Sequence, residues 1–186
     1  MYKLCKTEQS ARRQKELEQG LLKIMLQCRY EDISVSELCD HLNVPRKSFY
    51  RYFSSKDGAL YALLDHTMME FFDAEGSSAD LIPGTQMGDL DRYFTFWRQH
   101  SNLITALHRN GLAGILVDRA MKLAQRERLM PNYIQQMPQE TQSLALSFAV
   151  CGLISMVLQW YTQGFKTSPE EMTRIAVSML TKPLIQ

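Results

Sequence analysis

The stretch VPRKSFYRYFSSK, residues 44–56, gathers the side chains of this sequence that are best suited to bind an anion. It holds four cations and no acidic residue. Guanidinium and ammonium groups donate hydrogen bonds to phosphate oxygens, and tyrosine hydroxyls do so as well. Arg46, Lys47, Tyr50 and Tyr52 therefore favour contact with the phosphates of a nucleic acid. The alternative is a solvated charged face on which the two tyrosines are half-buried packing residues.

Of the four cations, Lys56 is the one whose position is least explained by a contribution to the stability of the fold. It falls in the first turn of an expected helix, where a positive charge opposes the helix dipole by about 0.3–1 kcal/mol. A phosphate docked at that helix start would reverse the sign, because the free N–H groups and the lysine would both face the anion. We therefore expect Lys56 to bind phosphate.

The elements that must position these residues form a helix-turn-helix pattern. Ser34 and Glu37 match a capping box, which predicts a short helix from 34 to about 42. Asn43 stands where a sharp turn needs a residue that tolerates positive φ. Pro45 suits the first turn of a second helix, from 45 to about 53. Phe49 and Phe53 are four residues apart and form the core side of that helix.

The rest of the chain also reads as helix, so the predicted fold class is all-α. Apolar spacing and end signals indicate helices at about 10–28, 54–71, 89–100, 102–110, 112–128, 139–164 and 169–181. Ser168, Pro169 and the two acids after them are a strong helix start. Glycine, serine and proline cluster at 73–88, and two prolines lie within 129–139, which predicts loops there.

Composition narrows the function classes. The net charge is +1, but residues 1–58 hold 11 Lys/Arg against 8 Asp/Glu, which puts an anion-binding surface in the first third. The four cysteines form no CxxC pair and no metal-ligand spacing, so we expect reduced thiols in a cytoplasmic protein, with no metal and no cofactor. The sequence has no Gly-rich phosphate loop, HExxH or GxSxG motif, so we expect no enzyme.

A membrane anchor is not expected either. The first 16 residues lack the apolar core of a signal peptide. Residues 144–161 approach the length of a membrane span, but Ser147, Ser155 and Gln159 interrupt the run and no Lys/Arg cluster flanks it. We expect this segment to be covered by protein instead.

The segment ISVSELCDHLNVPRKSFYRYFSSKDGAL resembles the DNA-binding domain of TetR-type bacterial transcription regulators, whose tail has the form aromatic-x-aromatic-Phe-x-x-Lys. The resemblance implies an N-terminal three-helix helix-turn-helix domain, residues 1–64, and a C-terminal all-α domain for ligand binding and dimerisation, residues 65–186. It implies that Arg46, Lys47 and Ser48 read base edges, and that Ser34, Tyr50, Tyr52 and Lys56 hold phosphates. Arg12 and Arg13 precede the core of the first helix and either touch DNA or form a solvated terminus.

Small residues recur every four positions along 143–155 and would let another helix approach closely. The segment from 152 to 172 resembles, more weakly, the paired helices through which TetR-type proteins dimerise. We therefore predict a homodimer through about 140–164 and 169–182. The predicted interface residues are Ser147, Cys151, Ser155, Met172 and Met179.

The C-terminal two-thirds also carry methionine and aromatic residues that could line an apolar pocket, although such residues at helical spacing are usually core. The resemblance implies a small effector here, and a protein effector is an alternative. The candidate pocket residues are Tyr93, Phe96, Trp97, His100, Met121, Met156 and Trp160.

The sequence thus predicts a transcriptional repressor that binds a palindromic DNA operator as a homodimer and is released by an effector. The alternative is a helical interaction module or co-regulator with a helix-turn-helix fold that does not bind DNA.

Overall fold

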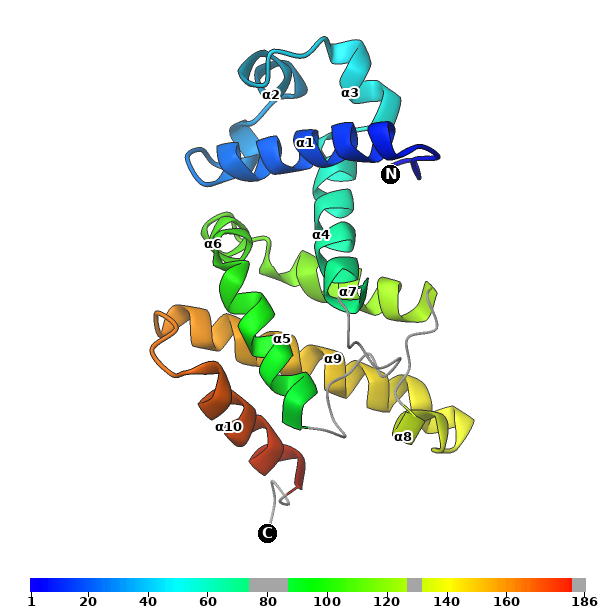
Figure 1. The fold of residues 1–186 in the computed structure, drawn as a ribbon, viewed down its shortest axis with the longest axis vertical. Helices are drawn as coiled ribbons and strands as arrows, with labels where there is room; N and C mark the ends of the chain where they lie inside the picture. Colours follow the sequence, from blue (N-terminus) through cyan, green and yellow to red (C-terminus); the bar gives the residue numbers. More distant parts are fainter. Residues whose placement is uncertain (74–86, 127–131, 182–186) are drawn as a thin grey trace.

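Residues 1–73, 87–126 and 132–181 are described by the computed structural model, and almost all of their regular structure is helical (Figure 1). The N-terminal unit comprises α1 (Glu8–Met25), the 3-10 turn η1 (Tyr30–Asp32), α2 (Val35–His41) and α3 (Arg46–Tyr52). The C-terminal unit comprises α5 (Met87–Gln99), α6 (Ser101–Arg109), α7 (Ala113–Arg126), α8 (Asn132–Gln135), α9 (Gln139–Thr162) and α10 (Pro169–Thr181). The all-α prediction is confirmed.

Helix α4 (Lys56–Asp73) runs from the N-terminal unit into the C-terminal one and packs against both α1 and α7 (Figure 1). Its buried residues lie on several faces, as expected of a helix that is covered nearly all round. The predicted division of the chain between 64 and 65 falls inside this helix. A movement of the C-terminal unit therefore acts directly on a helix that the N-terminal unit is packed against.

The predicted turn chemistry of α2 and α3 is confirmed in detail. The Ser34 hydroxyl accepts a hydrogen bond from the Glu37 backbone N–H at 3.1 Å, and the Glu37 carboxylate accepts one from the Ser34 N–H at 2.8 Å. Asn43 has a φ of 52° in the turn. Pro45 differs from the expectation by one position, since it is the N-cap residue and Arg46 begins the helix.

The end of α2 lies unusually close to α1 at Gly20. A Cβ atom at Gly20 would lie 2.4 Å from Cδ1 of Leu42. Glycine therefore permits the close approach that brings α2 and α3 onto α1, and any larger residue would have to displace Leu42.

The second predicted helix start is also confirmed: the Ser168 hydroxyl accepts a hydrogen bond from the Glu171 N–H at 3.3 Å, with Pro169 as the first helical residue. Gly164 has a φ of 72° just after α9, as its role as a stop predicts. Much of the two predicted loops lies outside the described residues, although α8 falls within the second one.

Helix α9 is long and apolar enough to cross a membrane by length and composition alone. One side of it is buried against α6, α7 and α8. Leu144 and Phe148, on another side, are 70% and 66% exposed. Part of this helix is therefore the core of the protomer and part is an uncovered apolar face.

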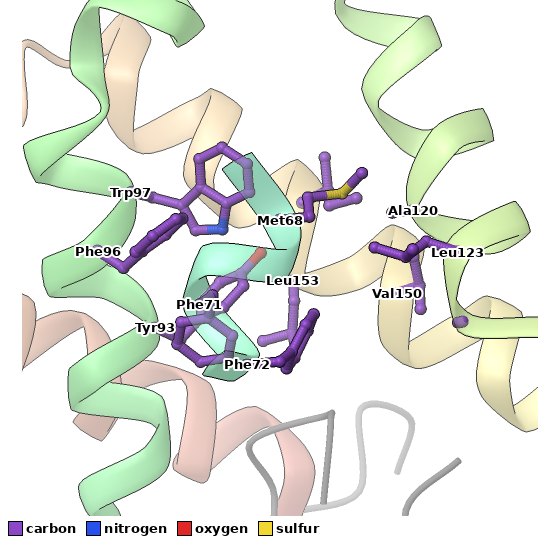
Figure 2. Close-up of a pocket in the computed structure, with 12 residues that line it drawn as sticks. Met68, Phe71, Phe72, Tyr93, Phe96, Trp97, Ala120, Leu123, Val150 and Leu153 are labelled. Atoms are coloured by element: carbon purple, nitrogen blue, oxygen red, sulfur yellow. The ribbon is translucent and has the colours of Figure 1, made fainter. Parts of the chain in front are cut away.

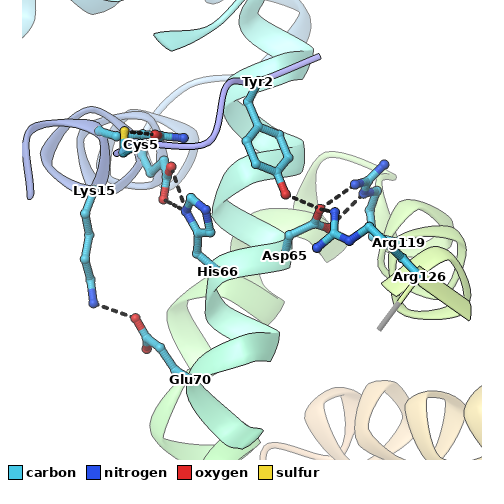
Figure 3. A network of polar contacts seen from close by, with 10 residues as sticks. Tyr2, Cys5, Lys15, Asp65, His66, Glu70, Arg119 and Arg126 are labelled. Carbon is cyan, nitrogen blue, oxygen red and sulfur yellow. Dashed lines mark hydrogen bonds and ion pairs between the residues drawn. The ribbon is translucent and has the colours of Figure 1, made fainter. Parts of the chain in front are cut away.

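Two buried acids fasten α4 to its neighbours (Figure 3). Glu18 of α1, 1% exposed, lies 3.0 Å from Nδ1 of His66. Asp65, also 1% exposed, accepts hydrogen bonds from Arg119 of α7 at 2.9 and 2.5 Å and from the Tyr2 hydroxyl at 2.7 Å. Buried carboxylates are tolerated only when paired in this way, so both contacts fix the position of α4.

We expect the stability of the protein to fall as the pH rises through the pKa of His66. The hydrogen bond to Glu18 raises that pKa above its usual 6.5, partly opposed by burial. The pairing therefore stabilises the fold fully below 6.5 and is lost as the imidazolium deprotonates above its raised pKa. Because the His66 side chain is 38% exposed, the loss should stay below about 1 kcal/mol.

The check is a series of urea unfolding midpoints between about pH 5.5 and 8.5. His66→Gln should flatten the alkaline decline, whereas His41→Gln, at an exposed position of α2, should leave it unchanged. An identical decline in wild type and His66→Gln would contradict the assignment.

Candidate nucleic-acid interface

Helix α3 turns its cations to solvent. Arg46, Lys47 and Arg51 are exposed, and Tyr50 is 51% exposed. Among the ion pairs formed by the described residues, none involves these three cations. Uncompensated charge of one sign on one short helix is the pattern of an anion-binding surface.

The opposite side of α3 is anchored by aromatic packing. Phe49 and Phe53 are 0% and 1% exposed, with ring centroids 5.1 Å apart. Tyr52 is only 7% exposed and packs beside Phe53. Most of the Tyr52 side chain is therefore part of the core, and its predicted contact with phosphate stays a prediction.

A polar cleft between the start of α1 and α3 was not predicted as a site. It has a volume of about 400 Å³. Its lining residues are Gln9, Ser10, Arg12, Arg13, Glu16, Ser48, Arg51 and Tyr52. Arg13 is already paired with Glu16 at 2.7 Å, so an anion in the cleft would compete with that carboxylate for the guanidinium. No local pattern predicts this cleft, because its two walls are about 35 residues apart in the chain.

The N-terminal residues hold the end of α3. The Lys3 backbone N–H donates to the Tyr52 carbonyl at 3.0 Å, and the Ser54 N–H donates to the Met1 carbonyl at 3.0 Å. Tyr2 forms an isolated antiparallel bridge with Phe53 and reaches Asp65 through its hydroxyl. This segment, residues 1–3, therefore links the end of α3 to the Asp65 pair, a connection between distant residues that no local pattern predicts.

Lys56 has a role different from the predicted one. Its ammonium donates to the carbonyls of Tyr30 at 2.5 Å and Ile33 at 2.6 Å, with Glu31 at 3.4 Å, and it lies 4.3 Å from the centre of the Tyr30 ring. An ammonium has three protons to donate. Carbonyls of η1 and of Ile33, the residue after it, thus occupy the ammonium, and we reassign Lys56 from phosphate binding to fastening this segment onto α4.

Ser34 and Ser48 keep positions that suit their predicted roles. Ser34 is exposed, and its hydroxyl accepts within the capping box, which leaves its proton free to donate. Ser48 is half-buried and lines the cleft between α1 and α3. Their contacts with DNA stay predictions.

An apolar cavity of about 60 Å³ lies between α4, α5, α7 and α9 (Figure 2). Aromatic side chains of α4 and α5 gather on one side of it, and aliphatic side chains of α7 and α9 on the other. Its lining residues are Met68, Phe71, Phe72, Tyr93, Phe96, Trp97, Ala120, Leu123, Ala124, Val150, Leu153 and Ile154. Three predicted pocket residues, Tyr93, Phe96 and Trp97, are therefore brought together here.

The other four predicted pocket residues do not line this cavity. Trp160 is 1% exposed and donates from its indole to the Thr167 carbonyl at 3.0 Å, so it is a core residue. His100 stacks on Phe96 outside the cavity, with ring centroids 4.1 Å apart. Met121 and Met156 pack half-buried against the core. Residue type alone could not separate these positions from true lining positions, because that depends on the face each helix turns inward.

Only some of the predicted dimer-interface residues lie at the surface. Ser155 and Met179 are exposed, with Met179 at 50%, and Ser147 and Cys151 are half-buried. Met172 is only 7% exposed and belongs to the core of the protomer, which corrects its prediction as an interface residue. Leu144 and Phe148, the two large apolar residues on the exposed face of α9, were not among the predicted interface residues.

Comparison with protein families gives two matches. The family described as "Bacterial regulatory proteins, tetR family" matches residues 29–63, which include α2, α3 and the start of α4. The family described as "Transcriptional regulator C-terminal region" matches residues 89–182, about half of the chain. Among curated proteins, no relative matches this chain.

Several solved structures share the fold. A TetR transcriptional regulator from Streptococcus agalactiae is similar with a TM-score of 0.64 and 16% identity, over 94% of this chain and 96% of that one. A TetR-family regulator from Streptomyces coelicolor gives 0.58 and 21%, over 91% and 79%. The fatty acid degradation regulator FadR from Bacillus halodurans gives 0.56 and 16%, over 94% and 97%. At these identities the likeness concerns the fold alone.

The reassignment of Lys56 leads to a prediction that separates stability from phosphate binding. Lys56→Met keeps the aliphatic stem but removes the charged donor, so it should lower the free energy of unfolding by about 1–3 kcal/mol, as loss of a charged hydrogen-bonding group does. The salt dependence of binding to duplex DNA should stay close to that of wild type.

The matched variant is Arg51→Met on exposed α3, which should lower the slope of log Kobs against log salt by about 1 with little change in stability. Urea unfolding and fluorescence anisotropy with a labelled duplex give the two quantities. A lower salt slope for Lys56→Met, with stability unchanged, would restore Lys56 as a phosphate ligand.

Proposed function

This chain belongs to the tetR family of bacterial transcriptional regulators, and we propose that it is a repressor that binds a palindromic operator as a homodimer and leaves it when an effector binds. It is a DNA-binding transcriptional regulator by family. The oligomeric state, the form of the operator, the effector and the residues that make each contact are the parts proposed here.

The observation that carries the DNA-binding assignment is the free charge of α3. Arg46 and Lys47 begin the helix, are exposed and have no carboxylate partner among the described residues. Long cationic side chains at the start of a recognition helix can reach guanine O6 and N7 in the major groove. We propose that Arg46, Lys47 and Ser48 read bases, and that Tyr50, Arg51 and Ser34 contact phosphates.

The homodimer is supported by the uncovered face of α9. Leu144 and Phe148 are more than 60% exposed, and exposed Gly152 and Ser155 continue the same side of the helix toward its end. Large apolar side chains next to small residues suit a second helix that packs closely. A two-fold axis through this face would present two α3 helices to half-sites about 34 Å apart, which matches a palindrome.

The effector step is supported by the position of α7. This helix supplies Ala120, Leu123 and Ala124 to the cavity wall, and Arg119, next to them in sequence, holds Asp65 of α4. A ligand that fills the cavity therefore acts on the helix that holds α4. It can shift the protein between DNA-binding and released states only by its difference in affinity for the two.

We infer that the protein works in the cytoplasm, where its DNA target lies, and that it performs no catalysis. The rival reading is a helical interaction module that does not touch DNA. Affinity for DNA that falls steeply with salt would separate the two, because only a DNA binder releases counterions from the duplex.

Substitutions on α3 test the proposed base contacts. With DNA selected by the wild-type protein from a random library, Arg46→Ala and Lys47→Ala should each lower specific affinity by about 1–3 kcal/mol and relax the preference at one base position. Lys166→Ala, an exposed cation between α9 and α10, is the matched control and should change neither. Unchanged sequence preference in both α3 variants would reject the base-reading roles.

A charge placed on the exposed face of α9 tests the dimer. Phe148→Arg should convert the protein to a monomer at micromolar concentration, because it puts an unpaired cation into an apolar interface. Leu4→Arg is the control, since Leu4 is 80% exposed and lies outside the proposed interface. Sedimentation velocity gives the masses, and a dimer that survives Phe148→Arg would place the interface elsewhere.

A further inference from the structure

We propose that the cavity between α4, α5, α7 and α9 binds a neutral, largely apolar molecule with an aromatic ring and one hydrogen-bonding group. This inference rests on the effector step proposed above and specifies the chemistry of that effector.

The lining of the cavity argues against a charged ligand. None of its twelve lining residues, all within the described parts of the chain, is acidic, basic or histidine. Arg92, a cation close to this wall, lies over the Phe71 ring at 4.5 Å and is not part of the lining. A carboxylate or an ammonium would lose its water and gain no opposite charge, which is strongly unfavourable.

The wall formed by α4 and α5 is suited to an aromatic ring. Phe71 packs edge to face with Tyr93 and Phe96, at ring angles of 87° and 64° and with centroids 5.9 and 5.4 Å apart. Tyr93 and Trp97 pack in the same manner at 6.3 Å. A set of rings already arranged edge to face offers both edges and faces to a further ring, whose packing gains more than area burial alone.

Tyr93 supplies the hydrogen-bonding group. The residue is 9% exposed, and no group in the described part of the chain accepts a hydrogen bond from its hydroxyl, although the Trp97 indole lies where its N–H can donate toward the hydroxyl oxygen. Burial raises its pKa, with the Trp97 indole partly offsetting the rise, so the phenol stays neutral and able to donate. A buried hydroxyl that donates no hydrogen bond is costly. A ligand with one hydroxyl or carbonyl in the cavity would satisfy it.

The size of the cavity indicates how the ligand would enter. An engineered cavity of about 150 Å³ holds benzene, whereas this one measures about 60 Å³. A ring must therefore displace part of the wall. Ala120 and Ala124 make α7 the wall with the smallest side chains, and Met68 is a flexible side chain that can change rotamer.

The experiment uses three probes of matched shape: para-ethylphenol, ethylbenzene and para-ethylbenzoate. Isothermal titration with the wild-type protein, up to about 1 mM probe, should give the tightest binding for para-ethylphenol. Ethylbenzene should bind about 3- to 10-fold more weakly for lack of the hydrogen bond. The benzoate should bind at least about 10-fold more weakly because of its charge.

Two variants keep the result interpretable. Tyr93→Phe should bring the affinities for para-ethylphenol and ethylbenzene together, while the charged probe stays weak. Ala120→Leu should fill the cavity and abolish binding of all three, whereas Lys122→Ala, exposed on the same helix, should leave the series unchanged. If Ala120→Leu does not fold, the comparison of Tyr93→Phe with wild type still tests whether the probes bind in this cavity.

Tightest binding of the benzoate, or no binding of any probe, would overturn the proposed ligand class. DNA affinity is measured separately on the same samples. Salt-dependent DNA binding without probe binding would reject the ligand class alone, whereas absence of DNA binding would reject the proposed function.

Discussion

The structure depends on keeping the buried carboxylate of Asp65 fully paired. A charge that is 1% exposed is tolerated only with hydrogen-bonding partners in place, and these come from two distant parts of the chain. Arg119 brings α7 to α4, and Tyr2 brings the N-terminal residues that hold the end of α3. Arg126 of α7 adds a third contact, 3.7 Å from the Asp65 carboxylate. Removing Arg119 or Tyr2 leaves this buried charge with fewer donors, which favours one arrangement of these segments.

The distribution of cations follows from where the fold uses them. Arg119 and Lys56 are engaged by a carboxylate and by backbone carbonyls, and Arg13 and Lys15 pair with glutamates on their own or a neighbouring helix. The cations of α3 have no such partner among the described residues. Because the protein has almost no net charge, its attraction for a polyanion must come from this local surplus and not from the molecule as a whole.

Most of the fold was predictable because its signals are local. The Ser34–Glu37 capping box, Asn43 in its turn and Ser168 before α10 each involve residues within four positions of one another. The site was less predictable because it depends on distant contacts. From the sequence alone Lys56 is expected to be a free cation, because no local pattern shows that η1 lies beside it. Met172 and Trp160 are expected at an interface and in a pocket, because the sequence does not show which face of each helix is buried. For the same reason the polar cleft between α1 and α3 could not be read from either helix alone.

The small cavity and the Asp65 pair together bear on how an effector would act. A ligand larger than about 60 Å³ must move a wall. The walls on α4, α5 and α9 carry large interlocked side chains, which leaves α7 as the wall that can move with least repacking. Movement of α7 strains the Arg119–Asp65 contact and, through Tyr2, the segment that holds the end of α3. Under the proposed effector mechanism, the free energy of loosening this pair is part of the cost of the expanded state, and a ligand shifts the population toward that state only by its extra affinity for it.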